Sequence, residues 1–301
     1  MDELIQKKYE LNFYMRIAYW MELQETFITL SFRNRCRRFM GMEKSDAIKS
    51  NVNIFAVGGD GFTHEQNSDN SDRMLEDYLL TLSSPHPNIG YIGHASNDDP
   101  ARLSAFFARF EGVANPSHLS VTADVTAAKA FVEDLDILYV GGGSTLNMLS
   151  HWRKTGIASV LMAAGQHGMI LSGVSAGAIC WFEQLLLSAE ENVYVLAAGL
   201  GLISGSACPH YSNDLSRQIA YDTQIRMGNL LSGVAIDDGV GVHIINGVVA
   251  KVVRTGAGNA YFVKGRSADA DRPACDEIGD AYERETKCDV ALLKAGDELV
   301  F

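Results

Sequence analysis

The stretch GMILSGVSAGAICWF, residues 168–182, places a single serine, Ser175, between Gly173 and Gly177. An apolar run precedes this serine and small apolar residues follow it, so G-x-S-x-G lies between an expected strand and an expected helix. In a nucleophile elbow the flanking residues must be small because the two backbones approach closely. Such a turn exposes the hydroxyl and puts the amide of Ala176 at a helix N-terminus, where it can stabilise an oxyanion. A tight strand–helix turn with an incidental serine gives the same pattern.

A serine hydroxyl needs a base to act as a nucleophile, and that base is usually a histidine oriented by a carboxylate. His210 follows the apolar run GLGLISGSAC and precedes a polar loop, so we expect it at a strand end near the serine. His64 and His94 also lie in expected strand-end loops, and a surface or core role is the alternative for each histidine. Three others lie in ordinary polar or helical surroundings: His86, His118 and His151.

Four short apolar runs end in glycine or small polar residues, and a helical stretch follows each of them. The runs span residues 52–61, 88–98, 135–145 and 168–177. Apolar runs that alternate with helices favour a parallel sheet covered by helices on both faces. Because ligands bind at the carboxyl ends of such strands, we expect the active face where the four runs end.

The rest of the chain differs from this pattern. Residues 1–50 show helical apolar spacing and a basic cluster, RNRCRR, which predicts a helical N-terminal extension. Residues 231–256 alternate β-branched residues around Asp237-Asp238-Gly239 and Asn246-Gly247, which is typical of antiparallel hairpins. We therefore expect an extension over residues 1–50, a catalytic domain over 51–265 and a tail over 266–301 that packs on the domain or extends it.

Composition narrows the classes of partner. With 301 residues, of which 47% are hydrophobic, the chain can bury a substantial core. A net charge of -12 argues against a nucleic-acid or anionic-membrane surface and favours a small-molecule or peptide partner. Five widely spaced cysteines without a CxxC pair argue against a disulfide framework or a zinc site, and favour a reducing cytoplasm. We expect the protein to need no metal or cofactor. The sequence is compatible with either a monomer or a homodimer.

One uncharged segment is long enough to cross a bilayer. Ile157 to Phe182 runs 26 residues without a formal charge. Gln166, His167 and several glycines interrupt it, so we interpret it as a helix end, a turn and a buried strand. Charged residues recur throughout the first 21 positions, which argues against a secretory signal there.

Four motifs in order carry a family resemblance. VGGGSTLNML, GVSAGAICWFE, GLGLISGSACPHYS and GVAIDDGVGVHII resemble the peptidase E group of serine peptidases, the dipeptidase E and cyanophycinase family of type S51. The resemblance extends from about residue 53 to about residue 256. It implies an α/β fold: a flavodoxin-like three-layer sandwich with a mainly parallel sheet, related to class I glutamine amidotransferases, plus a C-terminal β-hairpin region.

The resemblance also assigns roles to residues of this chain. It implies Ser175 as the nucleophile and His210, in the PH motif, as the base. The glycine-rich loop matches residues 141–145, whose amides at Gly142 and Gly143 would complete an oxyanion hole with Ala176. The alternatives for this loop are a phosphate cradle or a tight turn, and the lack of a following Lys-Ser or Lys-Thr pair argues against a P-loop.

The third member of the triad departs from the family pattern. Relatives have an acidic residue 13 to 15 positions after the serine, where this chain reads SAEE. Glu190 is our prediction, and Glu183 in CWFE is its rival. A backbone carbonyl is a further way to orient the histidine.

The sequence thus predicts a cytoplasmic serine peptidase that cleaves small peptides through an acyl-enzyme on Ser175. Arg217 and Arg226, which follow His210, are candidate cations for a substrate carboxylate, although no motif marks them. One alternative is a catalytically weak or inactive ligand-binding member of the same fold. Another is a small-substrate esterase or amidase, against which the short interval of 35 residues between the serine and His210 argues.

Overall fold

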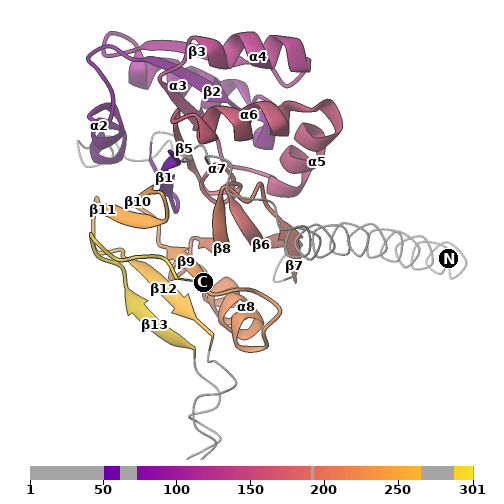
Figure 1. Ribbon diagram of the computed structural model, residues 1–301, viewed down its shortest axis with the longest axis vertical. Helices are drawn as coiled ribbons and strands as arrows, with labels where there is room; N and C mark the ends of the chain where they lie inside the picture. The colour runs from indigo at the N-terminus through magenta and orange to yellow at the C-terminus, as the bar shows by residue number, and fades with distance from the viewer. Residues whose placement is uncertain (1–50, 62–72, 191–192, 266–287, 301) are drawn as a thin grey trace, which may run out of the picture. The chain divides into compact units, whose positions relative to one another are not determined.

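Two β-sheets organise the described part of the chain (Figure 1). The computed structural model describes residues 51–61, 73–190, 193–265 and 288–300, all within the unit Ser50–Phe301. The expected extension over residues 1–50 lies outside the described residues, as do residues 266–287 of the expected tail.

The first sheet has seven strands in the order β11-β10-β1-β5-β4-β2-β3. Five consecutive strands of this sheet run parallel to one another. They are β1 (Asn53–Val57), β5 (Ile170–Val174), β4 (Ile137–Val140), β2 (Asn88–Ile92) and β3 (Asn115–Leu119). Two antiparallel strands complete the other edge: β10 (Val240–Ile245) and β11 (Val248–Arg254). The four apolar runs of the sequence are therefore confirmed as neighbouring parallel strands.

Helices cover both faces of this sheet. Successive strand residues point to opposite faces, so a continuously apolar strand has apolar side chains to bury on both. Ile54 and Ala56 of β1 join one core cluster, while Phe55 and Val57 join another. The first face carries α4 (Val125–Glu133), α5 (Thr145–Thr155) and α6 (Ile157–Gln166). The second face carries α2 (Met74–Leu80) and α3 (Pro100–Phe110), and a short 3-10 helix, η2 (His94–Ser96), follows β2. The α/β class is confirmed.

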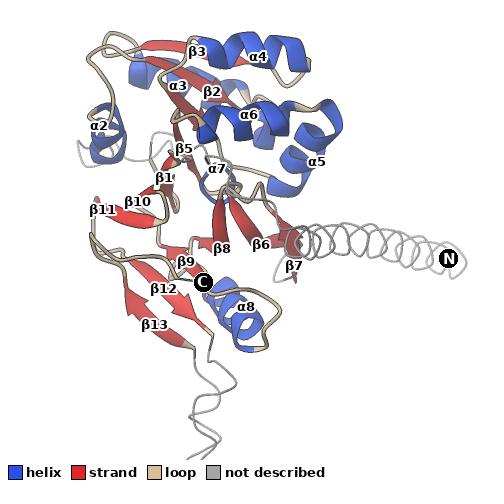
Figure 2. Cartoon of the chain, viewed as in Figure 1, coloured by secondary structure: helices blue, strands red, loops and turns tan. Residues whose placement is uncertain are grey.

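The second sheet has six strands in the order β13-β12-β9-β8-β6-β7. Its strands are β6 (Phe182–Glu190), β7 (Val193–Ala198), β8 (Ile203–Pro209), β9 (Gly233–Ile236), β12 (Ala260–Lys264) and β13 (Asp289–Leu292). Strands β6, β8 and β9 are parallel to one another. One face packs on α8 (Leu215–Arg226), as Figure 2 shows, and the other contributes Leu185, Ala207 and Val234 to the large core cluster of the first sheet. The sequence analysis did not predict this sheet.

Of the two turn sequences that predicted hairpins, Asn246-Gly247 forms one and Asp237-Asp238-Gly239 does not. Asn246 and Gly247 have φ of 52° and 81° and join β10 to β11 in the tight turn expected of an Asn-Gly pair. Asp237-Asp238-Gly239 instead connects β9 of the second sheet to β10 of the first. This turn therefore crosses between the sheets, and it matters for the site described below.

The uncharged segment from Ile157 to Phe182 is divided among short elements. It contains α6, β5, the single-turn helix α7 (Ala176–Ile179) and the first residue of β6. In the described ranges, no helix has the length and apolarity needed to span a bilayer.

Candidate active site

Ser175 lies in a sharp turn between β5 and α7. Its φ of 54° and ψ of -109° are unusual for a residue with a side chain, and its backbone N–H donates to the carbonyl of Val57 at 2.9 Å. Gly173 and Gly177 have no room for a side chain, since a Cβ on either would run into the backbone of Val140. The two glycines therefore allow the strand and the helix to meet where the serine projects.

His210 lies at the carboxyl end of β8, in the second sheet. It also has a positive φ, 54°, and the N–H of Tyr211 is fixed to the carbonyl of Ile236 in the neighbouring strand. Its Nε2 lies 2.9 Å from Oγ of Ser175. The structure therefore brings together the serine and the histidine that the sequence analysis selected, 35 residues apart.

Asp238 contacts the other ring nitrogen of this histidine. Its Oδ1 lies 2.5 Å from Nδ1 of His210. Asp238 follows β9, which is the parallel neighbour of β8 in the second sheet (Figure 1). Asp238 and His210 therefore follow the carboxyl ends of adjacent strands. Its backbone N–H donates to Oδ1 of Asn213 at 2.9 Å, which fixes the aspartate relative to the histidine loop. The chain order is serine, histidine, aspartate.

The prediction for the acidic residue needs correction. Asp238 takes the place beside Nδ1 of His210 where we expected Glu190. Glu190 is the last residue of β6, where it pairs with Val193, and its side chain lies outside the described residues. Glu183 is exposed on β6, because the elbow helix ends after one turn at Ile179 and a strand follows it.

Gly59 makes room for the histidine–aspartate contact. A Cβ at this position would overlap Oδ1 of Asp238 and would lie 2.5 Å from Nδ1 of His210. The carbonyl of Gly59 also accepts a hydrogen bond from the N–H of Gly239 at 3.1 Å. The loop after β1, in the first sheet, therefore packs directly on the pair that the second sheet carries.

The glycine-rich loop after β4 forms another wall of the site. Gly142 lies beside Ser175, since a Cβ on it would be 3.4 Å from Cβ of the serine. Gly143 and Ala176 line a small cavity of about 100 Å³ together with Ser175 and His210. Leu186, Leu187 and Ser188 of β6 close another side of this cavity.

The two adjacent aspartates after β9 have different surroundings. Asp237 is buried and accepts hydrogen bonds from the backbone N–H groups of Ser212 and Asn259, at 2.8 and 2.9 Å. It therefore anchors two loops, while Asp238 is half-buried and faces His210.

Two other histidines, His94 and His243, have core roles. His94 is buried, donates from Nε2 to the carbonyl of Leu119 and accepts at Nδ1 from the indole N–H of Trp152. Burial lowers the pKa of His94. His243 is also buried, between Tyr78 and Asn53, and burial lowers its pKa too. Of the strand-end candidates, His64 lies outside the described residues.

The two candidate arginines lie at opposite ends of α8. Arg217 lines the small cavity, with its guanidinium above the ring of Tyr194 and Nε 3.3 Å from a carboxylate oxygen of Asp214. Arg226 is exposed at the last position of the helix, about 13 Å further along it. Only Arg217 is placed to meet a ligand beside Ser175.

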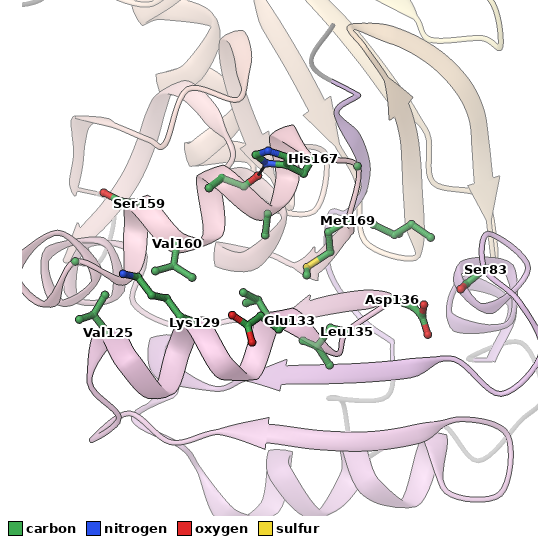
Figure 3. Close-up of a pocket in the computed structure, with 16 residues that line it drawn as sticks. Ser83, Val125, Lys129, Glu133, Leu135, Asp136, Ser159, Val160, His167 and Met169 are labelled. Atoms are coloured by element: carbon green, nitrogen blue, oxygen red, sulfur yellow. Dashed lines mark hydrogen bonds between the residues drawn. The ribbon is translucent and has the colours of Figure 1, made fainter. Parts of the chain in front are cut away.

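A larger groove lies at the opposite end of the first sheet. It has a volume of about 910 Å³ and runs between α4 and α6 to the amino ends of β4 and β5. Figure 3 shows Lys129 and Glu133 on one wall and Ser159 and His167 on the other. This groove holds no nucleophile–base pair, so its size does not make it the reactive site.

Metal ligands and thiols are the other reactive groups to consider in the described ranges. In these ranges no group of three or more histidine, cysteine or carboxylate side chains is arranged to hold a metal ion. The cysteines there, Cys180, Cys208 and Cys288, are free. Burial raises the pKa of the Cys180 and Cys208 thiols, which disfavours the reactive thiolate.

Comparisons with known proteins agree with the family suggested by the motifs. The sequence profile described as Peptidase family S51 matches residues 54–252. The chain is 36% identical over 214 residues to a protein of Bacillus subtilis (strain 168) named "Uncharacterized peptidase YgaJ", a match that covers 70% of this chain and 91% of the relative. It is 30% identical over 159 residues to "Peptidase E" of Citrobacter koseri, covering 46% of this chain and 69% of the relative.

A solved structure shares the fold. The crystal structure of a peptidase from an acI-B1 Actinobacterium superposes with a TM-score of 0.56 at 15% identity, covering 84% of this chain and 98% of that one. The profile match over more than half of the chain, together with the 36% identical relative, establishes that the chain belongs to peptidase family S51.

Proposed function

We propose that this protein is a serine peptidase that hydrolyses small peptides through an acyl-enzyme on Ser175. One observation carries the proposal: the hydrogen-bonded series in which Ser175 Oγ, His210 and Asp238 are joined at 2.9 and 2.5 Å. A series of this order, with the histidine between hydroxyl and carboxylate, is the arrangement that activates serine for acyl transfer.

The first half of the reaction follows from these contacts. With its proton on Nδ1 facing Asp238, His210 accepts at Nε2 the proton of the serine hydroxyl as Oγ attacks the peptide carbonyl. The carboxylate of Asp238 stabilises the imidazolium that forms. The histidine then donates this proton to the departing amine, and water later hydrolyses the acyl-enzyme by the same route in reverse.

The carbonyl oxygen becomes negative in the tetrahedral intermediate and needs donors. The backbone N–H groups of Ala176 and of the loop at Gly142 and Gly143 are our candidates, because these residues surround Ser175. The helix α7 has only four residues, so its dipole adds little and the amide hydrogen bonds themselves carry the stabilisation.

The size of the cavity supports a small substrate. A volume of about 100 Å³ accommodates one short side chain rather than an extended polypeptide. Arg217, in the same cavity, is the group that we propose to meet a substrate carboxylate. The cytoplasmic location remains a prediction from the cysteine pattern.

Labelling with a fluorophosphonate probe tests the serine mechanism, since the probe reacts with an activated serine. We expect the wild-type protein to be labelled and Ser175→Ala to be unlabelled, with peptide hydrolysis lowered by about 10⁴-fold or more. Circular dichroism serves as the folding control, because alanine fits the turn. Hydrolysis by Ser175→Ala within tenfold of wild type would exclude this mechanism.

The same experiment separates the alternatives. A folded wild-type protein that is neither labelled nor active on a panel of di- and tripeptides indicates a ligand-binding member of the family. Labelling together with hydrolysis of small esters or amides, but of no peptide in the panel, indicates an esterase or amidase.

A further inference from the structure

The glycine-rich loop after β4 is held to its surroundings by three hydrogen bonds. The N–H of Gly141 donates to the carbonyl of Ile92 at 3.0 Å, and the N–H of Ser144 donates to the carbonyl of Ala95 at 2.8 Å. Between them, the carbonyl of Gly142 accepts from Nη1 of Arg102 at 2.6 Å. The third bond is the only one of these three that a side chain makes.

Arg102 is well placed to serve as an anchor. It lies in the first turn of α3, where the side chain of Asp99 caps the helix and accepts the N–H of Arg102 at 3.0 Å. No carboxylate of the described residues lies within 4.0 Å of its guanidinium. The Gly142 carbonyl is therefore the acceptor to which this charged group is directed.

The bond to Arg102 determines which way the next amide points. The peptide between Gly142 and Gly143 is planar and trans, so the N–H of Gly143 is directed opposite to the carbonyl that Arg102 holds. Within the described ranges this N–H donates to no protein acceptor. Gly143 lines the cavity that also contains Ser175.

A peptide between two glycines needs such an anchor. Neither residue has a side chain to resist rotation, and Gly143 has a φ of 138°, which only glycine adopts readily. A Cβ at Gly143 would also collide with the carbonyl of Ala95, so a bulkier residue cannot provide the rigidity. The orientation of this amide must therefore be fixed from outside the loop.

We propose that Arg102 is a positioning residue for the reaction: by holding the carbonyl of Gly142, it keeps the N–H of Gly143 directed at the oxyanion formed on the substrate. The inference rests on the proposed function, because it assumes acyl transfer at Ser175. The charged hydrogen bond also polarises the Gly142–Gly143 peptide, which makes its N–H a stronger donor. Arg102 itself does not touch the substrate.

Three variants test this role. Arg102→Met removes the donors and keeps much of the side-chain length, while Arg102→Lys retains a charge and a single donor site. Arg153→Met is the matched control, since Arg153 donates to the carbonyl of Ala198 at the same distance, 2.6 Å, away from the cavity. For each protein we would measure kcat and KM on a peptide, the melting temperature, and the inhibition constant of a peptide boronate, whose tetrahedral adduct on Ser175 places an oxygen where the oxyanion forms.

An oxyanion donor that is lost outright costs about 10²- to 10³-fold in kcat, so a misaligned one should cost less. We expect Arg102→Met to lower kcat by roughly 10- to 100-fold and to weaken boronate binding by a similar factor, with KM within threefold of wild type. Arg102→Lys should lie between wild type and Arg102→Met, and Arg153→Met should leave kcat and boronate binding within threefold.

The outcomes distinguish this inference from the proposed function. Boronate binding and kcat within threefold of wild type in Arg102→Met overturn the role of Arg102 and leave the serine mechanism standing. The same conclusion holds if Arg102→Met raises KM and leaves kcat unchanged. It also holds if Arg102→Met and Arg153→Met both lose activity in proportion to a lowered melting temperature. A wild-type protein that binds no boronate and takes no fluorophosphonate overturns both.

Discussion

Asp238 and His210 follow two adjacent parallel strands of the second sheet, and their side chains meet at 2.5 Å although 28 residues separate them. Ser175, their partner, follows β5 of the first sheet. The site therefore depends on the packing of the two sheets against each other. A change that shifts one sheet relative to the other is expected to separate His210 from Ser175 before it unfolds either sheet.

Asp238→Asn should reduce turnover by roughly 10²- to 10⁴-fold while the protein stays folded. The amide has the same shape as the carboxylate, but its NH₂ group can donate to Nδ1 of His210 and so favour a proton on Nε2. In that tautomer the histidine cannot accept the serine proton. Steady-state kinetics on a peptide, with circular dichroism on the same samples, measure the effect.

Glu190→Gln and Glu183→Gln are the controls for this assignment. We expect both to hydrolyse the peptide within about threefold of wild type, because neither is the residue hydrogen-bonded to Nδ1 of His210. A severe defect in either variant, with a near-normal Asp238→Asn, would return the role to that glutamate. Mild defects in all three would indicate a serine–histidine dyad.

Gly59→Ala should lower kcat/KM by about tenfold or more without unfolding the chain. The added methyl group would overlap Oδ1 of Asp238 and crowd Nδ1 of His210, so the carboxylate must move away from the ring. Gly256→Ala is the matched control, since a Cβ there meets nothing within 4 Å. If both alanine variants keep full activity, the loop after β1 can move to accommodate the methyl group. The close packing of Gly59 against Asp238 and His210 then has no role in catalysis.

Local sequence patterns predicted the strands that are buried on both faces. Residues 52–61 and 168–177 are recognisable because a central parallel strand is continuously apolar and ends in a glycine-containing turn. Strand β3 was missed, since its sequence NPSHL lacks such a pattern and, among the described strands, it pairs with β2 alone at the sheet edge. Ser175 and His210 were found because each follows a strand within a motif.

Asp238 could not be selected in the same way. Its contact with His210 arises from the parallel pairing of β8 and β9, a long-range relationship that spacing along the chain does not reveal. The pair Asp237-Asp238 followed by glycine is also typical of a hairpin turn, which is how we interpreted it. Which of the two aspartates contacts His210 depends on which one is buried between the surrounding loops. That burial is a property of the folded chain.

The backbone positions of Glu183 and Glu190 depend on how soon the elbow helix ends. Residues 176–190 are rich in apolar residues, a composition that fits a buried helix and a buried strand equally. In the structure the helix ends at Ile179 and β6 begins at Phe182. Pairing of β6 with β7 and β8 determined the outcome, and periodicity alone does not indicate such pairing.

Arg217→Gln should weaken hydrolysis of acidic peptides selectively. Arg217 lines the cavity, so its loss should raise KM about tenfold for an aspartate-containing dipeptide and change the asparagine counterpart little. Arg226→Gln, at the exposed end of the same helix, should affect neither substrate. Equal losses on both dipeptides would mean that Arg217 supports the wall of the cavity through Tyr194 and Asp214 and does not select the substrate.

Asp214→Asn should destabilise the protein at neutral pH, and the loss should disappear in acid. Asp214 caps α8 and accepts hydrogen bonds from Ser216, Tyr194 and the backbone N–H of Arg217. Burial opposes the charge, but these hydrogen bonds outweigh it and lower the pKa of Asp214 to about 2. Loss of a charged cap at a partly exposed site costs about 1 kcal/mol.

The direction of the pH dependence follows from this lowered pKa. A carboxyl that is more acidic in the folded chain than in the unfolded chain stabilises the fold above its unfolded pKa, near 4, and ceases to do so as the pH falls through about 2. Urea unfolding of the wild type and Asp214→Asn should therefore differ by a constant amount from pH 5 to 7 and converge below pH 4. Asp124→Asn, at the cap of α4 where the side chain accepts one backbone N–H, is the matched control and should cost less at pH 7. A difference for Asp214→Asn that persists unchanged down to pH 2 would show that its charge contributes nothing and that the variant acts by altered packing.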